Sequence, residues 1–202
     1  MTSQQQALAI IQGEHRTLAA VIDALKHVAD EMAQGTLTPD YKLLWSIIYY
    51  IDAFPDALHH PKEDELLFPR IRARSHDVDA TLDDLGRQHT NSRPHLDALK
   101  TLLGRMEAEI PGAVEAFSTK VATYAGFHYK HMAQEEAEVF PKASEVLTAQ
   151  DWDEVAAAFA ANKDPLQDQG ATPGALSSEW FRQFYRRIVT LVPEPWGVGA
   201  RR

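Results

Sequence analysis

Histidine and glutamate recur at one fixed spacing in two segments of this chain. His59 precedes Glu63 by four residues, His131 precedes Glu135 by four, and a Phe-Pro pair begins five residues after each glutamate. Residues four apart on a helix lie on one face, so each pair can present an imidazole nitrogen and a carboxylate oxygen to one point. These two donor types are typical ligands of a metal ion.

Two further histidines lie upstream of these pairs, on stripes of apolar residues. His15 falls between Ile11 and Leu18, and His89 sits in the corresponding stripe of a later segment. One histidine on an apolar face is more often a hydrogen-bonded core residue than a ligand, and one His–Glu pair is often a solvated contact. An uncompensated interior carboxylate is costly, however, so the repeated set favours a metal site. The predicted ligands are His15, His59, Glu63, His89, His131 and Glu135.

His60, next to His59, is a further candidate ligand. It can pair with Asp56 or Asp64 at four-residue spacing. The repeat selects His59 instead, because Met132 stands at the position that corresponds to His60.

His128 and Tyr124 lie on the same stripe as His131, three and seven residues before it. They can contact the metal or its bound ligand, hydrogen-bond to the residues that bind the metal, or simply pack in the interior. These alternatives stay open. The remaining histidines are expected at the surface: His27, His76 and His95.

Apolar residues at steps of three and four predict four helices, at about 4–33, 39–73, 77–108 and 113–147. Prolines inside two of them predict kinks at Pro55, Pro61 and Pro94. Thr38 and Ser75 are expected to cap the second and third helices. The third helix repeats the first with an offset of 74 residues, and the fourth repeats the second with an offset of 72. The chain is therefore predicted to contain a duplicated pair of helical hairpins.

Short connections predict an all-α, up-down-up-down four-helix bundle. At a rise of about 1.5 Å per residue, His15 lies about 27 Å from the end of its helix, and His59 about 30 Å from the start of the next. In the second hairpin, the distance from each histidine to the connected end of its helix is about 27 to 29 Å. The four predicted histidine ligands are therefore expected at a similar height along the bundle axis. The expected organisation is a bundle over residues 1–147, with hairpins at about 4–73 and 77–147, and a helical extension over 148–202.

The composition excludes several classes of protein. None of the 202 residues is a cysteine, which excludes disulfides, thiolate zinc sites and iron–sulfur clusters. The net charge of −9 argues against nucleic acid as the main partner. The most apolar stretch, residues 43–54, is too short to span a bilayer, and no signal peptide pattern opens the chain. We expect a cytoplasmic protein.

The extension contains two helix signals. Thr148 and Asp151 form a capping-box pattern before a short helix, and Ser177 or Ser178 can cap a basic amphipathic helix that follows. The apolar face of that second helix holds Trp180, Phe184, Ile188 and Leu191. It is expected to pack on the bundle or across a homodimer; a protein partner is an alternative, and the acidic chain disfavours a membrane surface.

The pattern H…HxxxE…H…HxxxE, formed by the six predicted ligands, resembles the signature of the hemerythrin-like family and its HHE cation-binding domain. The resemblance covers about residues 7–147 and includes the Phe-Pro pairs. It implies a non-haem di-iron centre bridged by Glu63, Glu135 and an oxo or hydroxo group, with manganese or zinc as substitutes. One iron in such a centre keeps a position open for dioxygen or another small ligand.

Two departures separate this chain from the respiratory hemerythrins. Those proteins carry another histidine one turn after the ligand that corresponds to His89, where this chain has Arg93, and their last carboxylate is an aspartate at five-residue spacing. The two departures favour reaction with peroxide, nitric oxide or oxygen over reversible oxygen storage. The resemblance as a whole implies the binding of dioxygen or a related small oxidant, in sensing, scavenging or storage. The alternatives are a di-iron oxidoreductase that consumes peroxide or nitric oxide, and an iron-responsive regulatory module. No catalytic residue is predicted.

Overall fold

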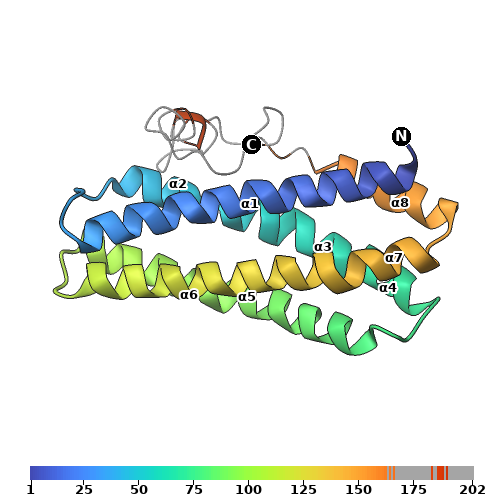
Figure 1. Cartoon of the computed structure of the whole chain (residues 1–202). Coiled ribbons are helices and arrows are strands. Elements are labelled where there is room, and N and C mark those ends of the chain that lie inside the picture. The colour runs from blue at the N-terminus through green and yellow to red at the C-terminus, as the bar shows by residue number, and fades with distance from the viewer. Residues whose placement is uncertain (163, 165, 167–182, 184–185, 189, 191–202) are drawn as a thin grey trace.

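The structure, a computed structural model, describes residues 1–162 together with 164, 166, 183, 186–188 and 190. Four antiparallel helical legs lie side by side, and a shorter helix follows them (Figure 1). The first and third legs are each one helix, α1 (Ser3–Ala33) and α5 (Asp79–Glu107). The second leg consists of α2 (Tyr41–Ile51), η1 (Asp52–His59), α3 (His60–Lys62), η2 (Glu63–Leu67) and α4 (Phe68–Arg72). The fourth leg consists of α6 (Ala113–Gln134), η3 (Glu135–Val139) and α7 (Phe140–Val146), and α8 (Ala149–Ala160) comes last. The described residues contain no strand, which confirms the predicted all-α bundle.

Two predicted helix caps are wrong. The cap of α2 is Asp40, whose carboxylate accepts a hydrogen bond from the amide of Leu43, and not Thr38. Ser75 caps no helix because its hydroxyl accepts from the amide of Asp77 inside the connecting turn. Helix α5 consequently begins four residues after Ser75, without a side-chain cap.

Three π-helical turns, η1, η2 and η3, interrupt the second and fourth legs. The residue that follows each turn directly precedes a proline and donates its amide to the carbonyl five residues back. The three bonds run from His60 to Pro55, from Phe68 to Glu63 and from Phe140 to Glu135. A proline ring clashes with the carbonyl four residues back, and a widened turn relieves that clash. The kinks expected at Pro55 and Pro61 thus take the form of wide turns, whereas α5 continues through Pro94.

The apolar core consists of two clusters that meet at the predicted metal site. Along α1 the change occurs at His15, since Ile11 belongs to one cluster and Leu18 to the other. The other three legs also change cluster at their predicted ligands. A layer of histidines and glutamates therefore lies between two apolar layers, which remove it from water.

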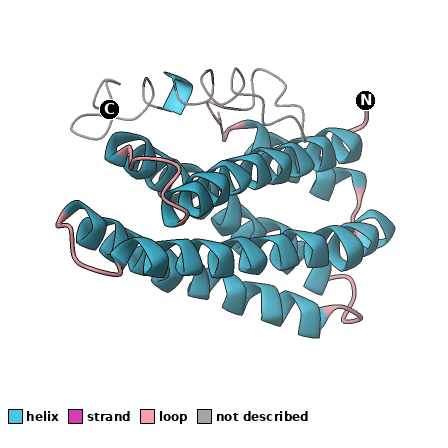
Figure 2. Cartoon of the chain, turned by 60° about the vertical axis from the view of Figure 1, so that its left-hand side comes forward, coloured by secondary structure: helices cyan, strands magenta, loops and turns pink. Residues whose placement is uncertain are grey.

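Helix α8 folds back along α1 (Figure 2). It buries Trp152 and Phe159 in one of the two clusters. The predicted capping box of Thr148 and Asp151 is present at its start. The predicted amphipathic helix lies mostly outside the described residues, but Ile188 is buried in the other cluster. Within the part of the chain that the structure describes, no helix is long and apolar enough to cross a membrane.

Candidate metal centre

The six predicted ligands converge in the centre of the bundle and form two overlapping groups. In each group the candidate ligand atoms all lie within 4.8 Å of one another. One group, here called the first half-site, contains His15, His59, Glu63 and Glu135. The second half-site contains His89, His131, Glu63 and Glu135. Because both glutamates belong to both groups, the geometry fits two neighbouring cations that share two carboxylates.

The Nε2 atoms of the four histidines face the two glutamates. His59 Nε2 lies 3.1 Å from Glu63, and His15 Nε2 lies 3.2 Å from Glu135. In the second half-site, His131 Nε2 is 3.3 Å from Glu135, and His89 Nε2 is 3.4 Å from Glu63. Each helical leg thus contributes one imidazole to the same small volume.

The Nδ1 atom of each of these histidines contacts an oxygen on a neighbouring leg. The contacts join His15 to Glu136 at 2.9 Å, His59 to Glu14 at 2.6 Å, His89 to Asp64 at 2.9 Å and His131 to Gln88 at 3.0 Å. An Nδ1–H that donates to oxygen leaves Nε2 with its lone pair toward the centre, which is the arrangement of metal-bound histidines. The oxygens therefore orient all four rings for cation binding.

These four orienting residues each adjoin a predicted ligand in sequence. Glu14 and Gln88 directly precede the first histidine of each hairpin, and Asp64 and Glu136 directly follow the two glutamates. They correspond at the same offsets as the ligands, 74 and 72 residues. Their roles were not predicted from the sequence, although the duplication places them at corresponding positions.

The shared carboxylates are fully buried and ionised. None of their four oxygens accepts a hydrogen bond of good geometry, although imidazole nitrogens lie close by. Burial and the charge of Glu63 raise the pKa of Glu135, but His131, His15 and His89 outweigh them and bring that pKa to about 2. Unsatisfied buried carboxylate oxygens among oriented imidazoles fit a cation.

The pKa values of His59 and His89 show the same need for positive charge, whereas burial lowers the pKa of His131. Burial lowers the pKa of His59, but the charge of Glu63 and the bond to Glu14 outweigh it and raise that pKa to about 10. Burial likewise lowers the pKa of His89, but its hydrogen bond to Asp64 and the nearby carboxylates of Glu135 and Glu63 outweigh it and raise that pKa to about 12. Protons on these rings balance the carboxylates in the metal-free chain, and a divalent cation can replace them.

His60 forms a third group, with His89 and His131, on the outer side of the second half-site. Its ring stacks on that of His89 with the centroids 4.4 Å apart, and its Nδ1 lies 3.4 Å from Asp56. Burial, together with the neighbouring imidazoles, lowers its pKa well below the usual value, so the ring is neutral. His59 and His60, though adjacent in sequence, are both buried and lie in different groups, and the wide turn η1 ends between them.

His128 and Tyr124 are buried behind His60 and belong to none of the three groups. Their rings lie 4.3 Å apart, and His128 is 6.3 Å from His60 between ring centroids. Burial, with smaller effects of neighbouring histidines, lowers the pKa of His128 to about 3. Among the histidines expected at the surface, His27 and His76 are exposed and His95 is half-buried.

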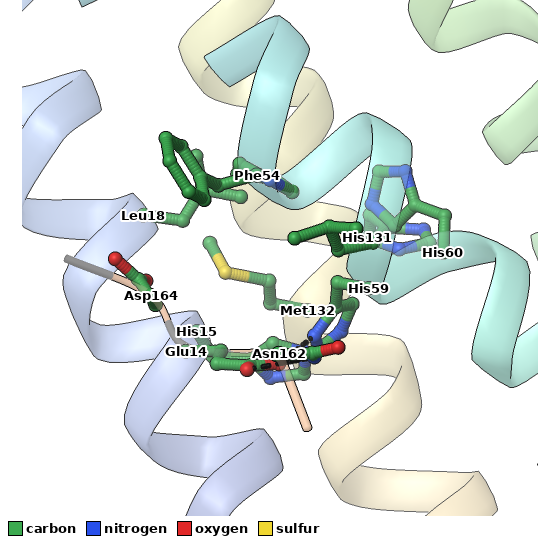
Figure 3. Close-up of a pocket in the computed structure, with 12 residues that line it drawn as sticks. Glu14, His15, Leu18, Phe54, His59, His60, His131, Met132, Asn162 and Asp164 are labelled. Carbon is green, nitrogen blue, oxygen red and sulfur yellow. Dashed lines mark hydrogen bonds and ion pairs between the residues drawn. The ribbon is translucent and has the colours of Figure 1, made fainter. Parts of the chain in front are cut away.

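A small cavity of about 20 Å³ adjoins the first half-site, large enough for one water-sized molecule. Leu18, Phe54 and Met132 form its apolar side, and His15 and His59 lie on the opposite side (Figure 3). Met132 corresponds by the repeat to His60. The cavity is thus lined by both histidines of the first half-site, and His131 and His60 reach it from the second. Beside the first half-site the repeat places the apolar Met132, whereas beside the second it places the imidazole of His60.

Comparison with known families agrees with this geometry. Residues 6–143 match the family described as hemerythrin HHE cation-binding domain. The chain belongs to this family. Membership implies that the HHE domain binds a metal cation, and the buried His/Glu groups supply its donors. No curated protein and no solved structure matches the chain significantly.

Proposed function

We propose that this HHE-domain chain binds two iron ions, bridged by Glu63 and Glu135, and uses them to bind dioxygen or a related small oxidant. The observation that carries the proposal is the pair of ligand groups that share these two buried carboxylates. A mixed set of imidazole and carboxylate donors without thiolate suits iron, with manganese or zinc as substitutes. A bound iron pair would supply the redox chemistry by which such small molecules are held.

We assign His15 and His59 to one ion and His89 and His131 to the other, with His60 as a third imidazole at the second. Stacking against His89 and the contact with Asp56 support the role of His60. His60 then supplies the fifth imidazole that the sequence lacks at Arg93, although it comes from a different leg.

The small ligand is expected at the first half-site, which has one imidazole fewer and adjoins the cavity. Leu18, Phe54 and Met132 exclude water from that side and favour a small uncharged molecule over an anion. The four orienting oxygens keep the imidazoles in place while the ligand enters. Because the cavity is small and apolar on one side, dioxygen and nitric oxide are the preferred ligands.

Anaerobic loading with ferrous iron followed by absorption spectroscopy tests the proposal. The protein should bind two irons per chain and give a new charge-transfer band on exposure to air or nitric oxide. Met132→His, which places an imidazole where the repeat has His60, should weaken the new band while two irons remain bound. A chain that holds one iron or none, or a diferrous protein unchanged by both gases, would contradict the proposal.

The same experiment separates storage or sensing from turnover. A stable adduct with dioxygen or nitric oxide indicates a binding protein. Continuous consumption of peroxide or nitric oxide with an added reductant indicates an oxidoreductase. Unfolding of the bundle on removal of iron would instead favour the iron-responsive module.

A further inference from the structure

The chain beyond the family domain reaches into the first half-site. The family match ends at residue 143, yet Phe159 and Asn162 both contact residues of the centre. Phe159, in α8, meets the ring of His59 edge-on with the centroids 5.5 Å apart. The second half-site has no comparable contact in the described part of the chain, so this attachment is not part of the duplication.

Asn162 is buried, and both ends of its side-chain amide are hydrogen-bonded. Its amide nitrogen donates to both carboxylate oxygens of Glu14, at 2.8 and 3.0 Å. Its carbonyl oxygen accepts from the ammonium group of Lys62, which fixes the orientation of the amide. Since Glu14 accepts from His59 Nδ1, Asn162 is one step behind a predicted ligand.

The described residues just beyond Asn162 also pack beside the cavity or in the core. Asp164 lines the cavity together with Asn162, and it accepts a hydrogen bond of 2.7 Å from the hydroxyl of Tyr50 in α2 (Figure 3). Leu166 is buried in the apolar cluster that contains Leu18. The described residues after Asn162 are thus held by one polar and one apolar contact.

We propose that the segment after α7 is a working part of the metal centre: Phe159 and Asn162 position the Glu14–His59 pair, and Asn162 with Asp164 closes the ligand cavity. This inference rests on the proposed two-ion site. Loss of Asn162 leaves the buried carboxylate of Glu14 short of donors, so that Glu14 and then His59 move. Asn162 is a positioning residue for one half-site only.

A pair of matched substitutions tests this asymmetry. Asn162→Leu removes the donor behind Glu14, and Gln134→Leu removes the acceptor behind Gln88, which holds His131 in the second half-site. Full-length protein is loaded with zinc, and release to excess chelator is followed, with ring ¹⁵N spectra of the histidines as a second readout. Partners of metal-bound histidines affect affinity by about 10- to 100-fold, so a residue one step further out should speed the release of one zinc by roughly tenfold.

The expected result is half-site selective. Asn162→Leu should change the ring signals of His59 and the release of one zinc, whereas Gln134→Leu should change those of His131. Unaltered release from Asn162→Leu, or equal changes at all ligand histidines, would overturn the inference. If Asn162→Leu does not fold, Asn162→Asp is used, because a second carboxylate against Glu14 must act in the same direction. A wild-type chain that fails to bind two zinc ions contradicts the proposed function instead.

Discussion

Replacement of Glu63 by glutamine should abolish most of the stabilisation that metal gives to this fold. Glu63 is fully buried and belongs to both half-sites, so the change removes a carboxylate oxygen from each ion. A ligand at a thousand times its dissociation constant stabilises by about 4 kcal/mol. For a chain of this length, 1 kcal/mol raises the unfolding midpoint by roughly 2–4 °C, so each ion should raise it by about 8–16 °C.

The assay is thermal unfolding of the metal-free and zinc-loaded protein, followed by circular dichroism. The metal-induced shift is a difference within one variant, so any effect of Glu63→Gln on the metal-free protein cancels. Glu65→Gln is the matched control, because Glu65 lies two residues further along the same turn and is exposed. The wild type and the control should show the full shift, and Glu63→Gln only a small part of it. A full shift in Glu63→Gln would refute the role of this carboxylate as a shared ligand.

Three further outcomes follow from the geometry. His60→Met, which copies the residue at the matching position of the repeat, should weaken zinc binding at one ion by at least the roughly 10- to 100-fold that the loss of a partner behind a ligand costs, and leave the other unchanged, as measured by competition with a chelator. Burial raises the pKa of Asp56 from 3.8 to about 6, so its ionisation costs stability as pH rises. The free energy of unfolding of metal-free Asp56→Asn, measured in urea relative to that of the wild type, should therefore rise by about 2 kcal/mol from pH 4.5 to pH 8. A difference between the two free energies that does not change with pH would contradict this cause. Leu18→Phe should fill the cavity and slow nitric oxide binding at unchanged iron content, seen by stopped-flow absorption.

The arrangement of the helices could be predicted from the sequence because it depends on local periodicity. Apolar steps of three and four gave the four legs within a few residues, and the repeat gave their pairing. The wide turns could not be predicted in this way. A proline inside a helical pattern indicates a disturbance, but the bond from His60 to Pro55 depends on how the legs pack. For that reason the sequence selected His59 over His60, whereas the structure buries both.

The site could be predicted only as far as the repeat reaches. The six candidate ligands converge as expected, and Glu14 and Gln88 could have been added by the same offset. The role of Asn162 could not be predicted from the sequence, because its partner Glu14 lies 148 residues away and the other hairpin contains no copy of the contact. The cavity beside Met132 was equally hidden, because it depends on side chains from several legs.

The central claim is that two metal ions lie side by side between Glu63 and Glu135. Anomalous diffraction from crystals of the iron-loaded protein, measured at the iron absorption edge, tests it most directly. We expect two peaks about 3.5–4 Å apart, one beside His15 and His59 and one beside His89 and His131. A single peak, or peaks away from the two glutamates, would contradict it.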